Sequence, residues 1–118
     1  MGLDQWLCKR PTITEEDEMI YWRKCNQIHG WFDRKVGGIE NCEEYDVTYN
    51  DLKELQDTCK KVLDNHELAE ELLPVMRGAF FGCYEYNDNY FEDLKYTIEQ
   101  LDTFLTNNDD EFYYHAWW

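Results

Sequence analysis

The last seven residues of the chain, 112–118, are mostly aromatic, and apolar character alternates along them as in a β-strand. A free aromatic tail is costly in water, so this segment has to be docked against the rest of the molecule. Its natural neighbour is a second strand-like segment, residues 3–9, which carries Trp6. We therefore expect Trp6 to meet Tyr114 or Trp118, and the fold to contain a sheet built from these two segments.

Helical patterns lie between these strands. Apolar residues recur at helical spacing, with capping residues or Gly and Pro at the ends, in residues 14–36, 49–64, 66–73 and 90–105. A short strand is expected within residues 40–47, and residues 75–86 read as extended. The pattern predicts an α+β fold in which three or four helices pack on a small, mostly antiparallel sheet formed by N-terminal, central and C-terminal strands.

Two helical stripes make the expected core specific. In residues 14–36 the stripe contains Tyr21, Cys25, Ile28, Phe32 and Val36. In residues 49–64 the stripe consists of Leu52, Leu55, Cys59 and Val62.

A chain of 118 residues fits one domain, and its 43% hydrophobic content argues against disorder. No apolar run approaches the length of a transmembrane helix, and no secretory signal is visible, so a cytoplasmic protein is expected. The five cysteines stand singly, without the close pairs of a zinc site, and are interpreted as small packing residues.

The charge of the chain is lopsided. The net charge is −15, from 26 acidic and 11 basic residues. Residues 1–35 hold six of each, so residues 36–118 hold 20 acids and five bases. Such a surface repels nucleic acid and attracts a protein with a basic groove. A charge of 15 also exceeds the roughly two to eight units that keep a small domain soluble.

We expect the acidic surface to contact a partner protein that has a basic nucleic-acid-binding groove. The candidate contact residues are Glu85, Asp88, Glu92, Asp93, Asp109, Asp110 and Glu111. The acids around Asp88, Glu92 and Asp93 do not follow the twelve-residue calcium-loop pattern, and neither do Asp109, Asp110 and Glu111. No metal and no cofactor are therefore predicted.

An alternative interpretation is a pocket for a nucleotide signal, in which aromatic rings stack on a base and cations neutralise phosphate. The candidate pocket residues are Trp22, Arg23, Asn26, His29, Arg77, Tyr84 and Tyr86. Neither glycine-rich phosphate-binding pattern occurs in the sequence. A third interpretation is an enzyme, because Cys25 and His29 are spaced as a nucleophile and its base could be. Their position in the middle of a core stripe favours packing, and no catalytic residue is predicted.

Five segments carry a resemblance to a known family. They are Met1-Gly2-Leu3-Asp4, Tyr21-Trp22-Arg23-Lys24-x-Asn26-x-Ile28-His29-x-Trp31-Phe32, Glu71-Leu72-Leu73-Pro74, Phe80-Phe81-Gly82 and Tyr90-Phe91-Glu92-Asp93-Leu94. Across nearly the whole chain the sequence resembles a family of small proteins encoded by tailed phages and prophages. The resemblance carries no assigned activity and no functional residue, and implies a small phage accessory gene. Such genes often encode stoichiometric inhibitors of host defence, so we expect a binding protein directed at a CRISPR effector, a restriction nuclease or a similar protein.

Overall fold

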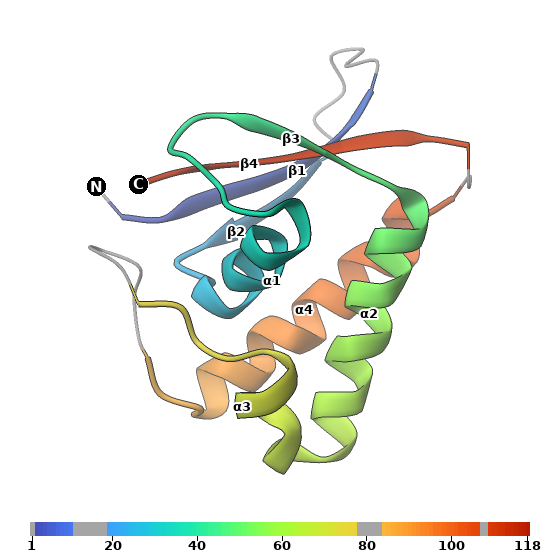
Figure 1. Cartoon of the computed structure of the whole chain (residues 1–118). Helices are drawn as coiled ribbons and strands as arrows, with labels where there is room; N and C mark the ends of the chain where they lie inside the picture. Colours follow the sequence, from blue (N-terminus) through green and yellow to red (C-terminus); the bar gives the residue numbers. More distant parts are fainter. Residues whose placement is uncertain (1, 11–18, 78–83, 107–108) are drawn as a thin grey trace.

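The computed structural model describes residues 2–10, 19–77, 84–106 and 109–118. Its elements, in chain order, are β1 (Asp4–Arg10), β2 (Met19–Arg23), α1 (Asn26–Val36), β3 (Glu44–Val47), α2 (Tyr49–Asp64), the short 3₁₀ turn His66–Leu68, α3 (Ala69–Leu72), α4 (Asp88–Phe104) and β4 (Glu111–Trp117). The predicted α+β fold is confirmed (Figure 1).

The four strands form one antiparallel sheet in the order β2-β1-β4-β3. The first and last strands in the chain therefore lie side by side in the middle of the sheet, as the aromatic C-terminal segment required. Seven residue pairs join them, from Asp4 opposite Trp117 to Arg10 opposite Glu111.

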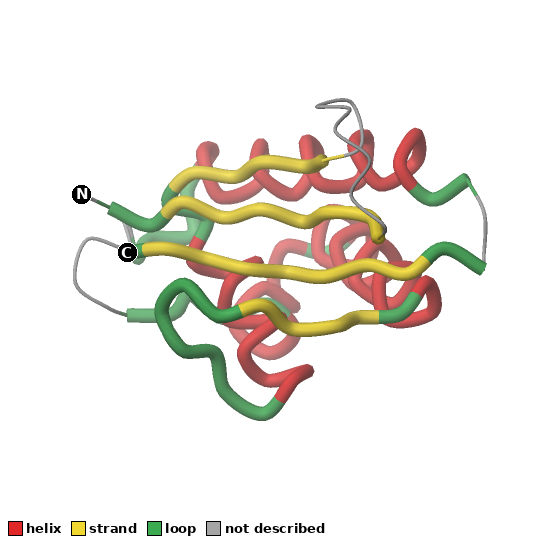
Figure 2. The backbone as a smooth tube through the Cα atoms, turned by 90° about the horizontal axis from the view of Figure 1, so that it is seen from above, coloured by secondary structure: helices red, strands yellow, loops and turns green. Residues whose placement is uncertain are grey.

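The helices lie together on one face of the sheet, and in Figure 2 the strands are seen in front of them. Side chains alternate between the two faces of a strand. Leu3, Leu7, Phe112 and Tyr114 are at most 1% exposed, and Leu7 pairs with Tyr114 on the helix side. The opposite face carries no helix from the described part of the chain, and we call it the uncovered face, although Cys8 and Tyr113, which point to it, are buried.

Trp6 does not meet the residues that the sequence suggested. It pairs with His115, and its indole ring lies 5.0 Å from the His115 ring and 6.4 Å from the Trp117 ring. Tyr114 and Trp118 are one position out of step with these residues, so they point to the other face. The pairing of the strands was right, and the expected ring partners were wrong by one residue of register.

The helix predicted over residues 14–36 is also wrong in its first half. Residues 11–18 lie outside the described residues, and Met19–Arg23 form β2, with Ile20 and Trp22 buried and Met19 exposed. Tyr21, expected in the core, is 41% exposed. The apolar residues of this segment fit both the helical period and the two-residue period of a strand. Pairing with β1 makes it a strand. The helix begins only at Asn26, after Lys24 adopts a left-handed conformation with φ of 53°.

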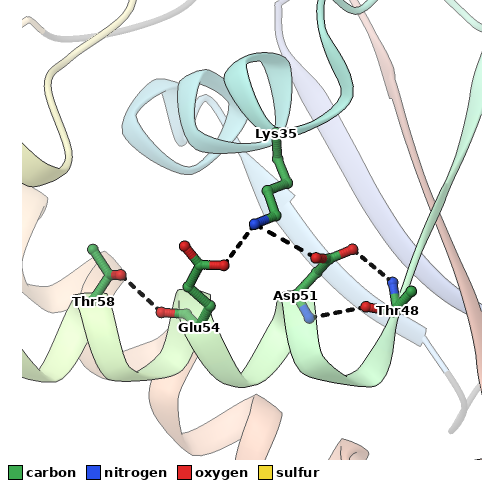
Figure 3. Close-up of polar contacts among 5 residues, drawn as sticks. All are labelled: Lys35, Thr48, Asp51, Glu54 and Thr58. Atoms are coloured by element: carbon green, nitrogen blue, oxygen red, sulfur yellow. Dashed lines mark hydrogen bonds and ion pairs between the residues drawn. The ribbon is translucent and has the colours of Figure 1, made fainter.

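The two long helices were predicted, although α4 (Asp88–Phe104) begins two residues before and ends one residue before the predicted range 90–105. α2 has the predicted bounds, and its stripe residues Leu52, Leu55, Cys59 and Val62 are all fully buried. Thr48 and Asp51 form a reciprocal capping box at its start (Figure 3). No described helix combines the length and the apolar character that crossing a bilayer requires.

Candidate functional site

The acidic residues proposed from the sequence fall into two separate groups. Glu85, Asp88, Glu92 and Asp93 lie just before α4 or in its first turns, whereas residues 109–111 follow its other end. A helix of 17 residues is about 25 Å long, so the two groups do not form one surface. Asp93 is also half-buried, which raises the pKa of its carboxyl group although hydrogen bonds from Gln27 and Cys25 lower it.

The second group has neighbours that the sequence did not identify. β3 pairs with β4, so Glu44 lies opposite His115 and Asp46 lies opposite Tyr113. The segment before β3 is attached to the same strand, because the amide of Cys42 donates to the carbonyl of Ala116 over 2.9 Å. This border of the sheet therefore collects seven carboxylates from two segments about 65 residues apart. We call them the acidic edge: Glu40, Glu43, Glu44, Asp46, Asp109, Asp110 and Glu111.

The acidic edge extends along β4 and past its start. β4 has seven residues and spans about 23 Å at roughly 3.3 Å per residue. Asp109 and Asp110 precede β4, and Glu40 and Glu43 precede β3, which pairs with it. The acidic edge thus presents negative charge over a length comparable to that of a strand, and a phosphate-binding groove attracts such a surface.

Three carboxylates of the acidic edge have no ion pair with a lysine or arginine of the described part of the chain: Glu40, Glu43 and Glu111. Asp110 has one, because Lys9 lies 3.8 Å from it. Six of the seven carboxylates are exposed, and Asp110 is half-buried. The charges of Glu40, Glu43 and Glu111 are therefore available to solvent or to a partner.

The first turns of α2 provide a contrast. Lys35, at the end of α1, reaches the carboxylates of Glu54 over 2.6 Å and Asp51 over 3.6 Å (Figure 3). The hydrogen bond to Glu54 raises the pKa of Lys35 above its ordinary value. These two acids are compensated inside the molecule, whereas Glu40, Glu43 and Glu111 of the acidic edge have no such lysine or arginine in the described part of the chain.

A pocket of about 380 Å³ opens within the acidic edge. It is lined by Asp46, Val47, Thr48, Tyr49, Asp110, Glu111 and Phe112. Carboxylates beside aromatic rings form a suitable environment for a guanidinium or ammonium group. No group of three or more His, Cys, Asp or Glu side chains within the described ranges is arranged to hold a metal ion.

Three residues of the alternative nucleotide pocket belong to the core. Trp22 is 3% exposed, and its indole N–H donates to the Thr97 hydroxyl over 2.9 Å. Asn26 is 1% exposed and accepts a hydrogen bond from the amide of Met76. His29 is fully buried, with its Nδ1 atom 2.8 Å from the Tyr114 hydroxyl. These three side chains do not line an open pocket, because the sheet and the helices cover them.

The remaining four pocket candidates are divided between two places. Arg23 is exposed and shares the uncovered face of the sheet with Tyr21, since residues two apart in a strand point the same way. The Arg77 guanidinium lies 5.1 Å from the Tyr84 ring centre, and the Tyr86 hydroxyl accepts from the amide of Val75. Residues 78–83 of the same segment lie outside the described residues. The described side chains therefore do not bring the seven candidates together.

The Cys25–His29 pair is enclosed as well. Burial raises the pKa of the Cys25 thiol well above its ordinary value and lowers the pKa of His29 to about 4. Both groups are neutral at neutral pH, and neither reaches solvent.

Comparison with protein-family models, with curated proteins and with solved structures finds no match. The candidate site therefore rests on the structure alone, and it is the acidic edge, where carboxylates from two distant segments lie along one border of the sheet.

Proposed function

We propose that the protein acts by stoichiometric binding to a protein with a basic nucleic-acid-binding groove, and inhibits it by occupying that groove. The observation that carries the proposal is the acidic edge, where seven carboxylates from two distant segments follow one border of the sheet. A groove that neutralises phosphates with Lys and Arg attracts such an edge for the same electrostatic reason.

The resemblance to small phage and prophage proteins suggests the biological setting. In that setting the target is a host-defence protein such as a CRISPR effector or a restriction nuclease, and the encounter takes place in the host cytoplasm. A phage-encoded inhibitor of this kind needs no catalytic group of its own, because it works by occupying the site that its target uses for nucleic acid.

The test compares two variants with the same net charge. The edge variant carries Glu40→Gln, Glu43→Gln and Glu111→Gln, and its matched control carries Asp57→Asn, Asp64→Asn and Glu70→Gln, which are exposed acids elsewhere. At about 0.5 kcal/mol per exposed charge, three neutralised contacts weaken binding about tenfold. The control variant should bind as the unmodified protein does.

The measurement is inhibition of purified nucleases of the two named classes, together with displacement of a labelled DNA duplex from them, at low and high salt. We expect inhibition to weaken steeply with salt and to be competitive with DNA. Equal losses in the two variants would mean that net charge alone is responsible. Inhibition that is not competitive with DNA would show that the protein does not occupy the nucleic-acid-binding groove.

A further inference from the structure

The uncovered face of the sheet presents aromatic side chains in cross-strand rows. In one row Tyr21 of β2, Trp6 of β1, His115 of β4 and Glu44 of β3 lie beside one another. Arg23, Asp4 and Trp117 form the next row on the same face. Figure 2 looks onto this face, with the helices behind the strands.

Trp6 lies at the centre of this group, which we call the aromatic face: Trp6, Met19, Tyr21, His115 and Trp117. The Trp6 ring stacks on the His115 ring with centres 5.0 Å apart and lies 5.7 Å from the Tyr21 ring. The Tyr21 hydroxyl donates to the Asp4 carboxylate over 2.5 Å. Because the rings brace each other, a partner would not have to order them on binding.

The aromatic face also holds most of the large apolar side chains that are exposed in the described part of the chain. The described residues include four large apolar side chains that are exposed, and three lie here: Trp117 at 61%, Tyr21 at 41% and Met19 at 39%. Single exposed apolar residues are ordinary, whereas a contiguous group marks an interaction surface. Trp and Tyr are the residues that most often dominate the energy of protein interfaces.

The charges around the aromatic face decide between its possible occupants. A single-stranded nucleic acid can stack on such rings, but its phosphates need cations. The described side chains of this face include one arginine, Arg23, and the carboxylates Asp4, Glu44, Asp46 and Glu111. A second copy would bring the same carboxylates, on a chain of net charge −15, against each other. A basic protein surface meets neither objection.

We propose that the aromatic face docks a basic protein surface through its arginine side chains, which stack on the exposed rings while their charge is met by Glu44 and Asp46. These two carboxylates belong to the acidic edge as well, so the face and the edge form one continuous interface. Burial lowers the pKa of His115 below its ordinary value, although Glu44 raises it, so the neutral ring does not repel a guanidinium. The choice of a basic occupant rests on the function proposed above.

The test uses an arginine-rich and a lysine-rich peptide of equal length and charge as probes, measured by calorimetry. Guanidinium groups stack on aromatic rings better than ammonium groups do, so the arginine peptide should bind more tightly. Trp117→Ser should weaken it at least about tenfold and reduce the preference for arginine. His66→Ser is the matched control, since His66 is an exposed ring that stacks on Phe91 away from the sheet, and should leave binding unchanged.

The outcomes separate the two proposals. If the edge variant loses peptide binding and Trp117→Ser does not, the aromatic face is wrong and the acidic edge stands. If Trp117→Ser alone loses binding, the face stands and the charge-based function fails. A single-stranded oligonucleotide that binds better than the peptides would overturn the basic occupant. Self-association that is abolished by Trp117→Ser would overturn it too, and would make the face a homodimer interface.

Discussion

At the scale of single residues, Gln5 joins the sheet to the first helix. Its side-chain amide donates to the carbonyl of Cys25 over 3.0 Å, and its side-chain oxygen accepts from the amide of Cys25 over 2.8 Å. The backbone leaves the sheet at this point, because Lys24 has a positive φ. Gln5 therefore takes the place of a strand partner where β2 ends, and it fixes where α1 begins. His29, one turn further, brings a titratable group into the core.

His29 should make the stability of the protein depend on pH. The unfolded state binds a proton near pH 6.5, whereas the buried ring does so only near pH 4. As the pH falls from 6.5 to 4 the unfolded state therefore holds more protons, and the free energy of unfolding falls, by up to about 3 kcal/mol from this residue. Urea unfolding across this range measures it.

The comparison has to remove the titration of the carboxylates, which acts in the same range. His29→Gln lacks the titrating ring, so its stability should depend less on pH than that of the unmodified protein. The control is His66→Gln, which replaces an exposed histidine stacked on Phe91 and should leave the pH profile unchanged. Parallel profiles for His29→Gln and the unmodified protein would show that the buried ring does not control this dependence.

At the scale of elements, the predictions that succeeded used local signals. α2 carries a capping box at its start and an apolar stripe at helical spacing, and both act within a few residues. β2 depends on pairing with β1, and the intervening residues 11–18 show no clear turn in the sequence. When the side chains of a segment fit both the helical and the strand period, its secondary structure depends on the element that it packs against. The local sequence pattern does not identify that element.

The same distinction explains the candidate site. Residues 109–111 were predicted, because three consecutive acids are visible in the sequence. Glu40, Glu43, Glu44 and Asp46 were missed, because their connection to residues 109–111 exists only through the pairing of β3 with β4. Four acids in seven residues without a base are a usable signal once that pairing is known. The aromatic face was missed because the expected ring partners of Trp6 were one residue out of register with the observed partner, His115.

The capping box of α2 should contribute measurably to stability. The Thr48 hydroxyl accepts from the amide of Asp51 over 3.1 Å, and the Asp51 carboxylate accepts from the amide of Thr48 over 2.9 Å. Thr48→Ala removes the first bond and should cost about 1 kcal/mol, because a helix-terminal amide loses its acceptor. Thermal unfolding should show a decrease of roughly 4 °C.

Thr58 supplies the matched control on the same helix. Its hydroxyl donates to the carbonyl of Glu54 inside the helix (Figure 3), which already has a backbone partner there. Thr58→Ala should therefore change stability by less than about 0.5 kcal/mol. Equal losses for the two variants would mean that the cap has no special weight.

At the scale of the whole molecule, the distribution of charge works against folding. None of the 22 carboxylates among the described residues is buried, and 17 are exposed. Like charges held close together on a compact molecule repel each other, and salt screens this repulsion. The protein should therefore be more stable at high salt than at low salt. Glu40, Glu43 and Glu111 should contribute to that difference, since they are exposed and form no ion pair with a lysine or arginine of the described part of the chain.

This leads to a prediction that separates functional from structural charge. The edge variant Glu40→Gln, Glu43→Gln and Glu111→Gln should be more stable than the unmodified protein at low salt, by about 0.5 to 1 kcal/mol, although it binds its partner less well. Glu54→Gln removes a carboxylate that pairs with Lys35, so it should be neutral or destabilising. Urea unfolding of both variants at low and high salt provides the comparison. If the edge variant is destabilised, the edge carboxylates support the fold. If the edge variant is stabilised, the three carboxylates destabilise the fold, as expected of groups that serve binding.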